Sequence, residues 1–198
     1  MTYFLYSDKE INHLRSRDKK LATVIDRIGI IKREVNPDLF SALIESVVGQ
    51  QISNKAADTV CDRLDALCGF DADKLFKMTV EDIQSCGMSK RKAEYIKGIA
   101  GTVVNRAIDL DSLKEMPDID VIKTLTALKG VGTWTAEMLL IFSLMRPNVI
   151  SYDDLAIRRG MMNLYEHKEL PKERFLRYAK RYLPYSSVAS LYIWELSH

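Results

Sequence analysis

Two adjacent aspartates, Asp153 and Asp154, stand in the segment VISYDDLAIRRG, just before an expected helix. A carboxylate beside a reacting carbon can stabilise the positive charge that develops there, and it can polarise an attacking water molecule. Acidic residues at the start of a helix also interact favourably with the helix dipole. The pair therefore offers a candidate catalytic group, a candidate helix cap, or one residue of each kind.

The segment LKGVGTWTAEMLL places Gly130 and Gly132 between two helical patterns. Glycine permits positive φ at such a turn, and Thr133 is expected to cap the helix that follows. The N–H groups and the dipole at the start of that helix form a site for an anion such as a phosphate, beside the positive charge of Lys129. An ordinary turn between two helices is the alternative, because the glycine spacing alone does not distinguish the two.

Aromatic residues lie close in sequence to these motifs. Trp134 follows the glycines, Tyr152 precedes the aspartates, and Tyr185 lies in the later segment LPYSS. Aromatic ring faces attract cations, so these side chains could form a pocket for a positively charged ring. Packing in the protein core is the alternative for each of them.

Among the basic segments, SKRKAEYIK is the strongest candidate for contact with a polyanion. Ser89 and Lys92 are singled out because helix N-terminal N–H groups and positive side chains coincide there. A solvated surface is the alternative interpretation. The formal net charge of +2 neither requires nor excludes a polyanionic partner.

Helices are expected to position nearly all of these residues. Apolar residues repeat every four positions in NPDLFSALIESVVGQQIS, where Asn36 is the expected N-cap, and Ser53 is the expected cap of the next helix. About eight to ten such patterns follow one another with short connections and almost no strand pattern. With 47% apolar residues in 198, the chain can bury a sizeable core, and we expect an all-α fold.

Composition also excludes several classes of protein. No apolar run approaches the roughly 18 residues of a membrane span, and the N-terminus lacks the features of a signal peptide. Three cysteines, Cys61, Cys68 and Cys86, are too few for a four-ligand zinc or iron–sulfur site and argue against a disulfide scaffold. We therefore expect reduced thiols and no membrane partner, with a cytoplasmic, nucleoid-associated or nuclear location.

Four segments in this order resemble the helix-hairpin-helix DNA glycosylase superfamily, and within it the 3-methyladenine DNA glycosylase II branch. They are IESVVGQQISNKAA, LKGVGTWTAEMLL, VISYDDLAIRRG and LPYSSVASLYIW. Any one of them alone would be unspecific, but together they span roughly Val35 to Trp194, nearly the whole chain.

The resemblance implies a two-lobed helical bundle with a helix-hairpin-helix element and without an iron–sulfur cluster. The active-site cleft is expected between the lobes. The expected boundaries are 1–35 plus 146–198 for one lobe, 36–145 for the other, and about 120–145 for the helix-hairpin-helix element. The resemblance also suggests a monovalent cation near the carbonyls of Leu128 and Gly130. No other cofactor is expected.

The resemblance assigns roles to individual residues. Asp154 matches the catalytic aspartate, and an alternative register selects Asp153 instead. Gln51 matches the wedge that fills the gap left by an extruded base, although it could merely cap a helix bend. The backbone of the DNA would meet the glycine hairpin, and the basic turn at Ser89 described above is a second candidate contact.

Trp134 matches a tryptophan that lines the base pocket, and Tyr185 matches a stacking aromatic that is usually tryptophan. Tyr152 could line the same pocket. In relatives that cleave the DNA strand, a lysine replaces Trp134 and forms a Schiff base. The chain has no lysine between Lys129 and Lys168, so no lyase activity is expected.

The sequence therefore predicts a monomeric, monofunctional DNA glycosylase of the 3-methyladenine II type. It would extrude and excise alkylated purines, such as 3-methyladenine and 7-methylguanine, from damaged double-stranded DNA in base excision repair. Two alternatives stay open. One is a non-catalytic helix-hairpin-helix module that binds DNA, and the other is a glycosylase for uracil or mispaired adenine.

Overall fold

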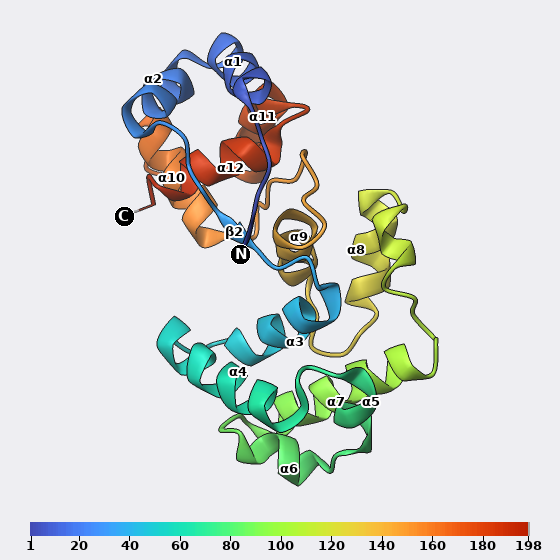
Figure 1. Cartoon of the computed structure of the whole chain (residues 1–198). Helices are drawn as coiled ribbons and strands as arrows, with labels where there is room; N and C mark the ends of the chain where they lie inside the picture. Colours follow the sequence, from blue (N-terminus) through green and yellow to red (C-terminus); the bar gives the residue numbers. More distant parts are fainter. Residues whose placement is uncertain (198) are drawn as a thin grey trace. The chain divides into compact units, whose positions relative to one another are not determined.

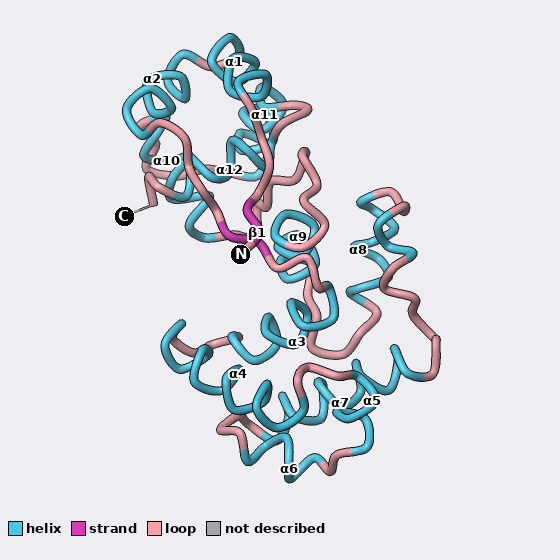
Figure 2. Tube along the Cα trace, in the orientation of Figure 1, coloured by secondary structure: helices cyan, strands magenta, loops and turns pink. Residues whose placement is uncertain are grey.

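The computed structural model describes residues 1–197 and is built almost entirely from helices (Figure 1). Within these residues, two short strands, β1 (Thr2–Tyr3) and β2 (Glu34–Val35), pair antiparallel (Figure 2). The expected all-α class is confirmed. The α-helices are α1 (Asp8–Arg17), α2 (Lys19–Ile28), α3 (Leu39–Gly49), α4 (Asn54–Cys68), α5 (Ala72–Lys77), α6 (Val80–Ser85), α7 (Lys90–Val104), α8 (Asp118–Thr126), α9 (Thr133–Phe142), α10 (Leu155–Tyr165), α11 (Lys172–Tyr182) and α12 (Ser186–Trp194).

The chain divides into two compact units. Residues 1–35 and 140–198 form the first unit, and residues 36–139 form the second. The second crossing between the units lies inside α9, between Leu139 and Leu140, whereas the sequence places it after Met145. Helix α9 contributes to both units because its apolar residues continue without a break across that point.

The first unit is organised around α12, against which α1, α2, α10 and α11 pack (Figure 1). Residues 186–193 of α12 are all buried, as expected for a helix that is apolar or small on every side. Helix α10 approaches α12 very closely at Gly160, where an added Cβ would lie 2.8 Å from Cγ2 of Ile193. This contact fixes the helix that begins directly after the two aspartates.

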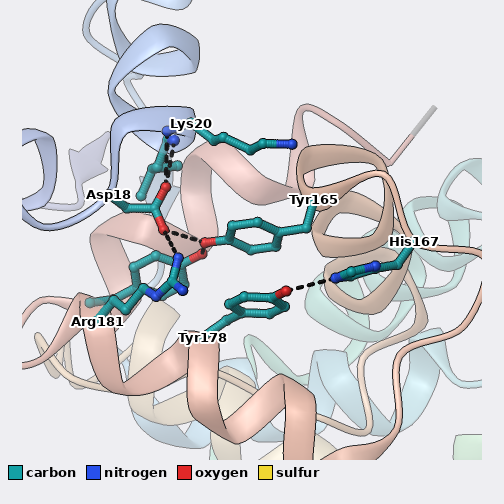
Figure 3. Close-up of polar contacts among 8 residues, drawn as sticks. Asp18, Lys20, Tyr165, His167, Tyr178 and Arg181 are labelled. Carbon is teal, nitrogen blue, oxygen red and sulfur yellow. Dashed lines mark hydrogen bonds and ion pairs between the residues drawn. The ribbon is translucent and has the colours of Figure 1, made fainter.

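A buried carboxylate also links three helices of this unit. Asp18 caps α2, and its Oδ2 accepts hydrogen bonds from the Tyr165 hydroxyl at 2.5 Å and from Arg181 at 2.9 Å (Figure 3). Burial acts to raise the pKa of Asp18, but the bonds from Tyr165, the Leu21 N–H and Arg181 outweigh it and lower that pKa. The carboxylate therefore ties α2 to the end of α10 and to α11.

In the second unit, α7 packs against α3, α5 and α6. Ser53 caps α4, as the sequence predicts, and Gly69 ends this helix in the left-handed region. The start of α3 differs from the prediction, because Asp38 is its cap. The Asn36 amide instead donates to the side chains of Ser41 and Glu45.

The three cysteines all lie in the second unit as free thiols. Burial raises the pKa of each thiol, and it raises that of Cys61 to about 11.

Across residues 1–197, no helix combines the length and the apolar character that crossing a bilayer requires.

Candidate functional site

The two glycines of the hairpin between α8 and α9 have different roles. Gly130 has a φ of +88°, and an added Cβ would lie 2.8 Å from Cγ of Tyr95 on α7. Glycine is therefore required there both for its backbone conformation and for close packing. Val131 is buried, and its N–H donates to the carbonyl of Leu128 at 3.2 Å, which closes the turn.

Gly132 differs, because its φ lies outside the left-handed region and a Cβ there would meet no atom within 4 Å. Its carbonyl accepts the first helical bond of α9, from Ala136 at 3.0 Å. Gly132 thus stands at the cap position, and Thr133 is the first helical residue rather than the expected cap. The missing side chain at Gly132 leaves open space on the outside, where a bulky anion can approach the helix start.

Alanine substitutions should separate the two glycines. Gly130→Ala should lower the free energy of unfolding by about 1–3 kcal/mol, because it strains the backbone and overpacks Tyr95. Gly132→Ala should change it by less than about 0.5 kcal/mol, since its Cβ meets nothing. Urea unfolding of both variants measures the difference, and equal losses would contradict the assigned roles.

The turn between α3 and α4 carries the predicted wedge residue. Gln51 is exposed and has a φ of +60°, a conformation that is uncommon for residues other than glycine. The side-chain amide of Gln50 donates to the Gly130 carbonyl at 2.8 Å, which joins this turn to the hairpin. Sequence reasoning missed Gln50, although the paired glutamines of GQQIS could have drawn attention to it.

Lys92 does not point outward as a phosphate-binding lysine would. Its Nζ donates to the carbonyls of Val48 at 2.7 Å and Gln50 at 2.5 Å, at the end of α3. Burial of the ammonium lowers the pKa of Lys92. Ser89 caps α7 through a bond from the Lys92 N–H at 3.4 Å. Both Ser89 and Lys129 are exposed.

The adjacent aspartates have unlike surroundings. Asp154 is 7% exposed and caps α10, with its Oδ1 accepting the Ile157 N–H at 2.9 Å. Asp153 is exposed. Helix capping was the alternative role that the sequence suggested for the two aspartates, and Asp154 does form this cap. It also holds the carboxylate in one orientation, as charge stabilisation by a preorganised group requires.

The predicted pocket residues also differ among themselves. Trp134 is 44% exposed at the start of α9. Tyr185 is half-buried, and its ring forms a T-shaped pair with the ring of His13, with the centroids 5.1 Å apart. Tyr152 already has two cations over its ring, from Arg158 at 5.1 Å and Lys172 at 5.5 Å. This arrangement favours a packing role for Tyr152, because the cations would repel a positively charged ligand.

The carbonyls suggested as cation ligands each accept one hydrogen bond. Leu128 accepts from the Val131 N–H, and Gly130 accepts from the Gln50 amide. A carbonyl oxygen has two lone pairs, so each could still coordinate an ion. These oxygens are suitable ligands for a hard cation, and the cation stays a prediction.

The sequence of the chain is similar to that of a known protein family. A family model described as HhH-GPD superfamily base excision DNA repair protein matches residues 44–184. That range contains the Gln51 turn, the glycine hairpin and both aspartates. DNA-3-methyladenine glycosylase 1 of Schizosaccharomyces pombe is 32% identical over 164 residues, which are 80% of this chain and 72% of that protein.

Solved structures agree in fold. The crystal structure of a DNA-3-methyladenine glycosidase from Bacillus halodurans has a TM-score of 0.88 and 35% identity, covering 100% of this chain and 93% of the other. The Schizosaccharomyces pombe 3-methyladenine DNA glycosylase in complex with abasic DNA has a TM-score of 0.82 and 29% identity. It covers 94% of this chain and 95% of the other.

Proposed function

The chain belongs to the HhH-GPD superfamily of base excision DNA repair proteins, and from this we propose that it is a monofunctional DNA glycosylase for alkylated purines. The observation that carries the proposal is the likeness to the Bacillus halodurans glycosidase, which extends over the whole chain. The substrates would be purines of the 3-methyladenine and 7-methylguanine type in double-stranded DNA. The protein would act as a monomer and without an organic cofactor.

Asp154 is the proposed catalytic carboxylate. Departure of the base breaks the C1′–N bond and leaves positive charge on the sugar, which a fixed carboxylate stabilises. Water then forms the new bond to C1′ and releases one proton, while a cationic methylated purine leaves as a neutral base. The buried position of Asp154 and its capping bond support this role over Asp153.

Trp134 and Tyr185 are the proposed walls of the base pocket. Their ring faces would attract the positive charge of an alkylated purine. This preference distinguishes the proposal from a glycosylase for uracil or mispaired adenine, which would need polar groups to bind the base edge. Because Trp134 stands where a Schiff-base lysine would, we also propose that the strand is left intact.

The start of α9 is the proposed contact with the DNA backbone. The open space at Gly132 lets a phosphate reach the first N–H groups of the helix, beginning at Thr133, and Lys129 lies next to it. The exposed start of α7, capped by Ser89, is a second proposed contact of this kind.

A methylated duplex provides the direct test. We expect the purified protein to release methylated purines and to produce strand breaks only after alkali treatment, because hydrolysis leaves an abasic but intact strand. Breaks without alkali would indicate a lyase. Binding without release would favour the non-catalytic module, and release only of uracil or mispaired adenine would favour the other glycosylase classes.

A further inference from the structure

Three parts of the second unit meet around the turn formed by Gln50–Ser53, here called the wedge turn. It follows the end of α3, it contacts the glycine hairpin, and it receives a lysine from the first turn of α7. None of these contacts involves the side chain of Gln51, which is exposed at the tip. The contacts of Gln50 thus restrain the wedge turn, whereas the side chain of Gln51 is exposed to solvent.

Lys92 fixes the first half of the wedge turn. Its ammonium donates to the carbonyls of Val48 and Gln50, two groups that the end of α3 leaves without helical partners. The carbonyl of Gln50 belongs to the peptide that leads directly into Gln51. The contact therefore restrains the peptide before a residue with a φ of +60°.

Gln50 and α7 join the wedge turn to the hairpin. The Gln50 amide donates to the Gly130 carbonyl at 2.8 Å. The ring of Tyr95, on the same helix as Lys92, packs where a Cβ of Gly130 would lie. A shift of the hairpin would therefore be passed to the wedge turn through this hydrogen bond, and both segments contact the same helix, α7.

We propose that Lys92 and Gln50 are positioning residues, which hold Gln51 ready to enter the DNA stack and tie it to the hairpin that binds the phosphate. The inference rests on the proposed function, since it needs an extruded base. Neither residue touches the reacting atoms. Their contribution is the orientation of Gln51 at the moment of base extrusion.

A second lysine of α7 provides a matched comparison. The Nζ of Lys97 also donates to two carbonyls, those of Phe76 and Met78 at the end of α5. Its helix, its chemistry and its type of acceptor are the same, but its acceptors lie away from the wedge turn in sequence. Lys97→Met therefore measures how much excision activity is lost when a lysine that donates to two carbonyls is removed from this helix at a position that does not contact the wedge turn.

The test uses single-turnover excision of the same methylated purine from two duplexes. In one the lesion is paired, and in the other it lies in a single-nucleotide bulge, where less unstacking is needed. Gln50→Ala and Lys92→Met should each slow excision from the paired duplex on the order of 10-fold to 100-fold. On the bulge they should stay within about 2-fold of the wild type, because the wedge matters less there.

Two further variants complete the experiment. Lys97→Met should excise from both duplexes like the wild type. Gln51→Ala should reproduce the loss on the paired duplex, and adding Gln50→Ala to it should cause little further loss, because both act at one step.

Equal losses on both duplexes, no loss on either, or the same loss in Lys97→Met would overturn the inference. Multiplicative effects of Gln50→Ala and Gln51→Ala would overturn it as well. If the wild type excises from neither duplex, the proposed function itself fails, which is a distinct result. Gln50→Ala removes no buried charge, so it keeps the test decisive if Lys92→Met does not fold.

Discussion

Asp154→Asn should lower the excision rate at least about 10²-fold to 10³-fold while binding to DNA persists. The loss follows from removing the charge that stabilises the sugar cation, since fixed electrostatic groups of this kind contribute that much to rates. The fold should survive, because asparagine is as good an N-cap as aspartate and can still accept the Ile157 N–H. Single-turnover release of methylated purine, with a parallel binding titration, measures both effects.

Asp153→Asn is the matched control for that experiment. It removes a carboxylate from the neighbouring exposed position and leaves the cap of α10 in place. Excision by this variant should stay within a few-fold of the wild type, because an exposed charge is largely screened by solvent. If Asp153→Asn abolishes excision and Asp154→Asn does not, the alternative register is correct.

Asp18→Ala should lower the free energy of unfolding by about 3 kcal/mol at neutral pH. About 1 kcal/mol comes from the lost N-cap of α2, and about 2 kcal/mol from the charge-assisted bonds to Tyr165 and Arg181. Urea unfolding measures the loss. Asp26→Ala is the control, because its ion pair with Arg15 is exposed on both sides and should contribute less than about 1 kcal/mol.

The contribution of Asp18 should also depend on pH in a defined direction. The folded protein lowers the pKa of Asp18, so the stabilisation is fully present above the unfolded value of 3.8 and is lost as pH falls through the folded pKa. The difference in unfolding free energy between the wild type and Asp18→Asn should therefore shrink once the pH drops below about 4. A difference that stays constant from neutral pH to pH 2 would contradict a charge-based role.

Local signals made much of the fold predictable. Ser53 and Ser89 cap their helices because a serine hydroxyl at the start of a helix accepts a hydrogen bond from a backbone N–H that has no helical partner. Asn36 and Asp38 flank one proline, so either could cap α3 by local rules. In the structure Asp38 is the cap, and the Asn36 amide donates to the side chains of Ser41 and Glu45, which come within its reach only once α3 has formed.

The site was less predictable, because its details depend on residues distant in sequence. The direction of Lys92 depends on carbonyls 42 and 44 residues earlier in the chain. Which glycine takes the positive φ depends on the approach of Tyr95 to Gly130. Local spacing could place a glycine hairpin and a turn at Gln51, but it could not show that one helix holds both.

The raised pKa values of the three thiols have a consequence for a protein that would work where DNA is being alkylated. Electrophiles that methylate purines also methylate thiolates, and only the ionised sulfur reacts quickly. With a pKa of about 11, roughly one Cys61 side chain in ten thousand is a thiolate at pH 7. Burial raises the pKa of Cys68 and Cys86 as well. The fold therefore makes its cysteine thiols poor targets for the reagents that create its proposed substrates.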